Sequence, residues 1–85
     1  MSDLQKLFDD AVEESKKLRQ LPDENIQLKL YALYRQGTSG DAGGVRPSAN
    51  DTLGRAKYDA WSRIAGISKE QAMQQYVNFV FLLKD

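Results

Sequence analysis

Apolar residues recur every three or four positions through four segments of this chain, and this periodicity is the strongest constraint on its fold. Such spacing places the apolar side chains on one face of a helix, and no segment shows the alternation typical of a strand. Proline or glycine separates the segments at Leu21-Pro22, at Gly37 and at Gly66. The pattern predicts an all-α fold within one domain, residues 1–85, with helices at 3–20, 24–36, 53–65 and 68–84.

Residues that cap helices stand in front of three of these segments. Asp23 precedes the second segment, and Asp51 or Thr52 precedes the third. Ser68 and Gln71 have the spacing of a capping box ahead of the fourth. Residues 37–53 form the longest irregular stretch and are rich in glycine, which predicts a flexible crossover rather than a P-loop, because no Gly-Lys-Ser/Thr follows.

The composition argues against several classes of function. The 85 residues include no cysteine and no histidine, so a thiolate metal site and the usual general base of an enzyme are missing. Lys+Arg and Asp+Glu both total 12, which gives no bulk attraction to nucleic acid. No apolar run is long enough to span a bilayer and no signal-peptide pattern opens the chain. We therefore expect a cytoplasmic protein without cofactor or metal, without nucleic-acid binding and without stable membrane insertion.

Aromatic and basic residues are interleaved on the second and third segments. Tyr31, Tyr34 and Arg35 share one side of a helix, and Lys57 and Trp61 are four residues apart on the next. Rings stack on flat heterocycles, and cations bind phosphate oxygens. The pattern favours a ligand that combines the two, although Tyr31 and Tyr34 as core aromatics are the alternative.

The same residues carry a resemblance to a known family. The chain resembles the acyl-CoA-binding proteins from about Phe8 to Tyr76. The resemblance rests on Pro22 to Gly40, with Tyr31-x-x-Tyr34-Arg35-Gln36 inside it, on Arg46-Pro47, and on Lys57-Tyr-Asp-Ala-Trp61. The resemblance implies a four-helix bundle of the up-down-down-up type. It also implies an intracellular carrier that binds long-chain fatty acyl-CoA and performs no chemistry on it.

The resemblance further implies a set of binding residues. Tyr31 would line the adenine site, Tyr34 would help to hold the 3′-phosphate, and Arg35 stands where the family usually has a phosphate-binding lysine. The remaining residues implied for the nucleotide end are Lys57, Lys16 and Tyr76. The candidates for contact with the acyl chain are Phe8, Val12 and Leu28.

Some positions depart from the family pattern and keep rival functions open. Tyr58 stands where a second tryptophan is common, and Phe79, Phe81 and Leu82 stand where members usually carry charged residues. Three exposed apolar side chains would mark a contact surface. We expect a monomer with self-association through these three residues as the alternative, and a helical protein-interaction module as the rival function. An enzyme acting on CoA thioesters is the other rival, and no nucleophile motif supports it.

Overall fold

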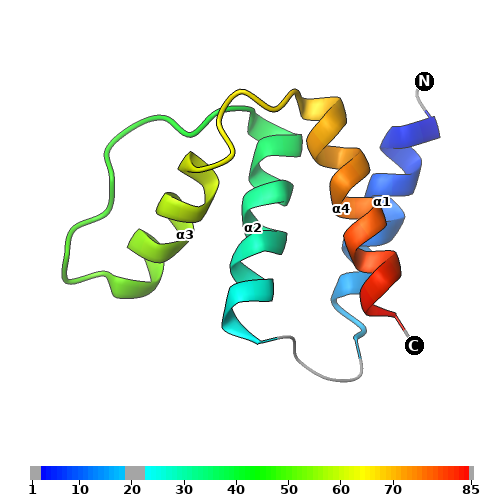
Figure 1. The fold of residues 1–85 in the computed structure, drawn as a ribbon, viewed down its shortest axis with the longest axis horizontal. Helices are drawn as coiled ribbons and strands as arrows, with labels where there is room; N and C mark the ends of the chain where they lie inside the picture. Colours follow the sequence, from blue (N-terminus) through cyan, green and yellow to red (C-terminus); the bar gives the residue numbers. More distant parts are fainter. Residues whose placement is uncertain (1–2, 19–22, 85) are drawn as a thin grey trace.

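The computed structural model describes residues 3–18 and 23–84, which contain four helices and no strand. The helices are α1 (Asp3–Ser15), α2 (Glu24–Ser39), α3 (Thr52–Ser62) and α4 (Lys69–Leu83). In Figure 1, α1 and α4 run downwards while α2 and α3 run upwards, which is the predicted up-down-down-up arrangement. The all-α class and the bundle type are thus confirmed.

Three of the predicted caps are present. Asp23 accepts a hydrogen bond from the Ile26 amide at 2.9 Å, and Asp51, rather than Thr52, accepts from the Gly54 amide at 3.0 Å. Ser68 and Gln71 form the complete capping box, with both of its bonds at 3.0 Å. Each cap pairs an amide that the first turn of a helix leaves without a partner.

The second helix does not end at Gly37 as predicted, and the reason lies in packing. Gly37 is buried inside α2, where an added Cβ would lie 3.0 Å from Met73 Cγ and 3.4 Å from Phe8 Cζ. Glycine therefore leaves room against α2 for the Met73 side chain of α4 and the Phe8 ring of α1. The helix ends instead at Ser39, before Gly40, whose φ of 84° favours glycine.

Two other boundaries were predicted too far along the chain. The first helix ends at Ser15, before the predicted end at residue 20. Residues 19 and 20 and the predicted break at Leu21-Pro22 lie outside the described residues. The third helix ends at Ser62, and tight turns follow in which Ile64 and Ala65 each donate to the carbonyl three residues earlier. The fourth helix differs by a single residue at each end from the predicted 68–84.

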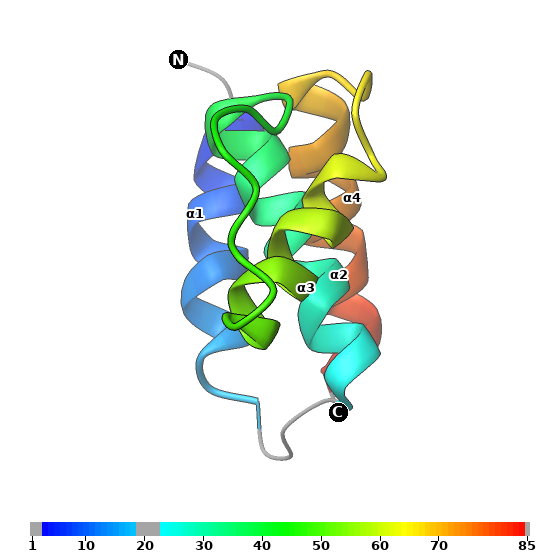
Figure 2. The same cartoon turned by 90° about the vertical axis from the view of Figure 1, so that its left-hand side faces the viewer.

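The core lies where α4 packs between α1 and α2, while α2 also packs on α3. Figure 2 shows α3 and the long loop beside it in front of α2, with α1 and α4 behind to the left and right. The buried residues of the core are Phe8, Ala11, Leu33, Ala72, Met73, Tyr76 and Val80. No helix of the described residues is both long and apolar enough to cross a membrane.

One predicted feature of the last helix needs correction. Phe79 is not exposed: it is half-buried, it packs against the core, and the ammonium of Lys29 lies 5.0 Å from its ring centroid. Phe81 and Leu82 are exposed as predicted, with 73% and 76% of their surface accessible. The apolar surface on α4 is therefore smaller than the sequence indicated.

Candidate functional site

A cavity of about 370 Å³ opens between the end of α1 and the first half of α2. The Phe8 ring packs beside Gly37 of α2, behind this cavity. The residues that line the cavity are Val12, Ser15, Lys16, Leu18, Gln27, Leu30, Tyr31, Tyr34 and Tyr76. Three tyrosines and a lysine around aliphatic side chains suit a ligand with both a flat ring and an apolar part.

An aromatic cluster fixes the inner wall of this cavity. The ring of Phe8 stacks on Tyr34 with centroids 6.1 Å apart, and it meets the edge of Tyr76 at 5.2 Å. Phe8 itself is only 2% exposed and does not line the cavity. It acts as the support that holds the two tyrosine rings in place.

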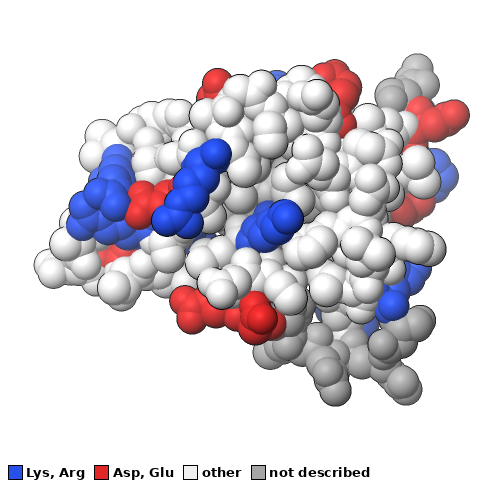
Figure 3. Space-filling model, in the orientation of Figure 1, with Lys and Arg blue, Asp and Glu red and all other residues white. Residues whose placement is uncertain are grey.

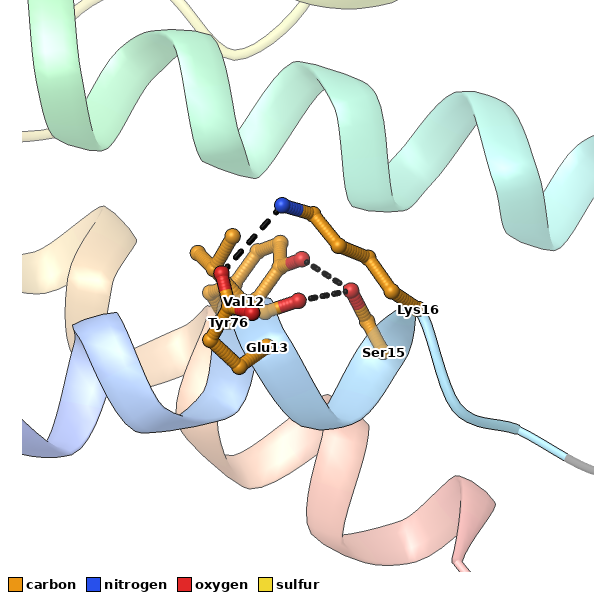
Figure 4. A network of polar contacts seen from close by, with 5 residues as sticks. All are labelled: Val12, Glu13, Ser15, Lys16 and Tyr76. Atoms are coloured by element: carbon orange, nitrogen blue, oxygen red, sulfur yellow. Dashed lines mark hydrogen bonds and ion pairs between the residues drawn. The ribbon is translucent and has the colours of Figure 1, made fainter.

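A short chain of polar contacts anchors Tyr76 to the end of α1 (Figure 4). The Tyr76 hydroxyl donates to Ser15 Oγ at 3.0 Å, and Ser15 in turn donates to the Val12 carbonyl at 2.7 Å. Burial raises the pKa of the Tyr76 phenol, and the bond to Ser15 opposes this shift in part. The phenol therefore stays protonated, as a donor in this chain requires.

Lys16 stands at the rim of the same cavity, just after α1 ends. Its ammonium pairs with Glu13 Oε2 at 3.2 Å, and both side chains are well exposed. An exposed pair of this kind is weak. Lys16 can therefore exchange this carboxylate for an anionic group of a ligand.

Two more cations lie against aromatic rings where α2 meets α3. The Lys57 ammonium is 5.3 Å from the centroid of the Tyr31 ring, and the Arg35 guanidinium is 4.6 Å from that of Trp61. In the described part of the chain neither cation forms an ion pair, and Arg35 Nε is buried without a hydrogen-bond partner. Lys57 is available to bind an anion beside Tyr31, and Arg35 is available beside Trp61.

The glycine-rich loop is attached to α3 by side chains from the same motif that carries Lys57. Arg46 forms a two-pronged ion pair with Asp59 at 2.8 and 2.7 Å. Trp61 Nε1 donates to the Gly40 carbonyl at 2.8 Å, and Trp61 is 7% exposed. The contacts of Arg46, Asp59 and Trp61 therefore hold the loop against α3. The sequence did not predict this structural role.

The structure brings most of the predicted site residues together, but not all of them. One cavity is lined by Tyr31, Tyr34, Lys16, Tyr76 and Val12. Lys57 lies against Tyr31, and Arg35 is one turn further along α2. The contacts of these residues with a ligand stay predictions. Among the candidates for the acyl chain, Phe8 lies behind the wall, and Leu28 lines a different cavity on the other side of α2.

Sequence reasoning missed four residues of the cavity wall. Gln27 and Leu30 could have been found from their spacing along α2. Gln27 precedes Leu30 by three residues and Tyr31 by four, and Leu30 precedes Tyr34 by four, so these side chains share one side of the helix. Ser15 and Leu18 follow Val12 at intervals of three, but only the structure shows that this face of the first segment borders the cavity.

Comparisons with known proteins agree on one family. The family model described as Acyl CoA binding protein matches residues 5–80. An acyl-CoA-binding protein homolog of Manduca sexta is 45% identical over 75 residues, covering 87% of this chain and 83% of that protein. Enoyl-CoA delta isomerase 2 of Homo sapiens is 40% identical over 76 residues, but these span only 19% of the isomerase, so its activity is not carried over.

Solved structures agree at the level of the fold. The crystal structure of Oryza sativa acyl-CoA-binding protein 2 superposes with a TM-score of 0.91 at 38% identity, over 94% of this chain and 89% of that one. The crystal structure of ACBP from Moniliophthora perniciosa superposes with a TM-score of 0.86 at 38% identity, over 98% of this chain and 80% of that one.

Proposed function

The chain belongs to the acyl-CoA-binding protein family, and we propose that it binds long-chain fatty acyl-CoA esters and carries them within the cytoplasm. The observation that supports this proposal is the set of tyrosines and cations around the cavity between α1 and α2. In the proposed complex the protein acts as a monomeric binding protein and performs no chemistry on the ligand.

The nucleotide end of the ligand is assigned to the rings and cations. Tyr31 stacks on the base, while Arg35 and Lys57 bind phosphate oxygens where α2 meets α3. Lys16 and Tyr76 bound the same cavity from α1 and α4, and Tyr34 completes the group. Within residues 3–18 and 23–84, Arg35 and Lys57 form no ion pair with a carboxylate, whereas Lys16 pairs with Glu13.

The acyl chain is assigned to the aliphatic wall of the cavity, against Val12 and Leu30. Burial of about ten methylenes at ~0.8 kcal/mol each contributes ~8 kcal/mol. Charge-assisted phosphate contacts add ~1.5–3 kcal/mol apiece, and association opposes them by at least ~4 kcal/mol. The balance permits submicromolar affinity that depends on chain length.

Calorimetric titration with acyl-CoAs of increasing length, free CoA and palmitate tests this proposal. Affinity should rise with chain length to a plateau, and both free CoA and palmitate should bind far more weakly. Arg35→Ala and Lys57→Ala should each weaken palmitoyl-CoA binding by ~1.5–3 kcal/mol. Lys6→Ala, on an exposed part of α1 outside the cavity, is the matched control. Equal affinities for free CoA and palmitoyl-CoA would contradict the acyl assignment.

The exposed apolar residues of α4 favour a second candidate, a protein-interaction module. Phe81 and Leu7, which is 51% exposed, line one groove between α1 and α4. Sedimentation of the chain alone over a range of concentrations, with Phe81→Ser compared, would detect self-association. A single monomeric species at every concentration would exclude self-association through α4 and leave only the carrier function.

A further inference from the structure

The Asp59 carboxylate on α3 stands among three arginines. Arg46 of the long loop forms the two-pronged ion pair with it, while Arg55 and Arg63 lie one helical turn before and after it. The hydrogen bond from Arg46 is the main cause that lowers the pKa of Asp59, and the charges of all three arginines lower it further. Three positive charges and one negative charge give this arginine cluster, Arg46, Arg55, Asp59 and Arg63, a net charge of +2.

The arginine cluster is accessible and lies apart from the cavity between α1 and α2. Over α3, at the left of Figure 3, an acidic side chain is flanked on both sides by basic ones. The side chain of Arg46 is 48% exposed, and Arg63 is exposed as well. No member of the cluster lines the cavity between α1 and α2. A partner bound to the cluster would therefore not compete for the residues of that cavity.

Two of the three guanidinium groups have no carboxylate of their own. Arg55 and Arg63 form no ion pair within residues 3–18 and 23–84, because the one carboxylate of the cluster binds Arg46 with both oxygens. Nearby, Asp41 accepts from the Gly66 amide and Asp51 caps α3. Arg55 Nε is buried without a hydrogen-bond partner, so the base of this guanidinium is packed against the protein and loses little freedom on binding.

The helix fixes the separation of these two arginines. Arg55 and Arg63 are eight residues apart, which places their Cα atoms about 12 Å apart along the helix axis. In an extended chain, residues four positions apart are separated by about 13 Å and their side chains point to the same side. Carboxylates at positions i and i+4 of an extended segment therefore match the two arginines. The side chain at i+2 faces Asp59, where like charge favours a neutral residue.

An acidic protein segment fits the arginine cluster better than an anionic membrane does. Recognition of anionic lipids uses clusters of about four to eight basic residues or an inserted apolar anchor. The described exposed large apolar side chains of α3 and its loop are Val45 and Leu53, and Leu53 lies on the other side of the helix from Arg55. Arginine forks suit carboxylates, as the two bonds from Arg46 to Asp59 illustrate.

We propose that the arginine cluster binds an acidic segment of a partner protein, extended along α3, with carboxylates at two positions four residues apart. Arg55 and Arg63 each pair with one of these carboxylates. Arg46 stays on Asp59 and holds the loop beside the bound segment. This inference does not depend on the proposed carrier function, because the cluster shares no residue with the cavity assigned to acyl-CoA.

The test uses the whole chain labelled with ¹⁵N and titrated at low ionic strength with the peptide acetyl-Gly-Ser-Glu-Ala-Ser-Ala-Glu-Ser-Gly-amide. The peptide should shift the amide resonances of Arg55, Asp59 and Arg63, both alone and with palmitoyl-CoA at saturation. The rearranged peptide acetyl-Gly-Ser-Glu-Ala-Glu-Ala-Ser-Ser-Gly-amide, with its glutamates two residues apart, should bind about tenfold more weakly, because one charge-assisted contact is lost.

Arg55→Gln with Arg63→Gln should weaken binding of the first peptide by about tenfold or more, with an unchanged circular dichroism spectrum. The control pair is Lys6→Gln with Lys84→Gln, which removes the same charge from α1 and the end of α4, two helices that do not pack on α3. Equal affinity of the arginine variant and the wild type would overturn the proposal, as would an equal loss in the control pair. So would displacement of the peptide by palmitoyl-CoA, or binding to phosphatidylserine vesicles without binding of the peptide.

Discussion

Gln36 joins three parts of the fold, and replacing it with leucine should destabilise the protein by about 1–3 kcal/mol. The side chain is 1% exposed, and its Nε2 donates to Asp41 Oδ1 and to the Ile67 carbonyl, both at 2.7 Å. Asp41 also accepts from the Gly66 amide at 2.9 Å. One amide therefore ties the end of α2 to the start of the long loop and to the turn before α4.

The magnitude follows from what each group loses. Gln36→Leu removes two hydrogen bonds worth ~1 kcal/mol each and leaves the Ile67 carbonyl without its donor, at a cost of ~1–3 kcal/mol. Against this, the variant also removes Gln36 Oε1, which is buried without a partner. Leucine has a similar volume and adds no cavity. The net loss should lower the melting temperature by at least about 4 °C in a domain of this size.

Urea unfolding followed by far-ultraviolet circular dichroism measures this loss. Gln74→Leu is the matched control, because Gln74 is exposed and its side-chain amide donates to Asn78 one turn along the same helix. That pair is worth ~0.2–0.5 kcal/mol. If Gln36→Leu and Gln74→Leu unfold at the same urea concentration, the hydrogen bonds of Gln36 do not stabilise the fold as argued.

Three further predictions concern the loop and the rim of the first cavity. Gly40→Ala should cost ~1–3 kcal/mol in urea unfolding, because φ 84° with ψ −153° is strained for any other residue, whereas Gly43→Ala, with open space around it, should be neutral. Glu13→Gln should tighten palmitoyl-CoA binding by up to about fivefold at low salt, since it frees the paired lysine at the rim; no change would contradict this reading. The bond from Arg46 lowers the pKa of Asp59, so the stability from this pair is present above the ordinary aspartate pKa and is lost as pH falls through the lowered one. The melting temperatures of the wild type and of Asp59→Asn should therefore converge in acid. If the difference between the two melting temperatures stays constant from pH 7 to pH 2, the ion pair does not cause it.

Local signals in the sequence were sufficient for the helices and for the family. Asp23 and Ser68 act at the positions where cap chemistry placed them, because a cap depends on a few consecutive residues. The motif within Pro22–Gly40, together with Arg46-Pro47 and Lys57 to Trp61, was sufficient for the resemblance that the family comparison confirms over residues 5–80. These properties are readable because they depend on short-range spacing.

Helix packing decided the rest. Gly37 looked like a helix stop, yet it lies within α2 because Phe8 and Met73 from two other helices pack against it. Phe8 is buried behind the cavity wall, and Leu28 faces a second cavity because α3 and α4 enclose that side of α2. Periodicity determines which residues share a helix face, but the neighbour that a face meets depends on contacts between residues far apart in sequence. Only the tertiary structure decides those contacts.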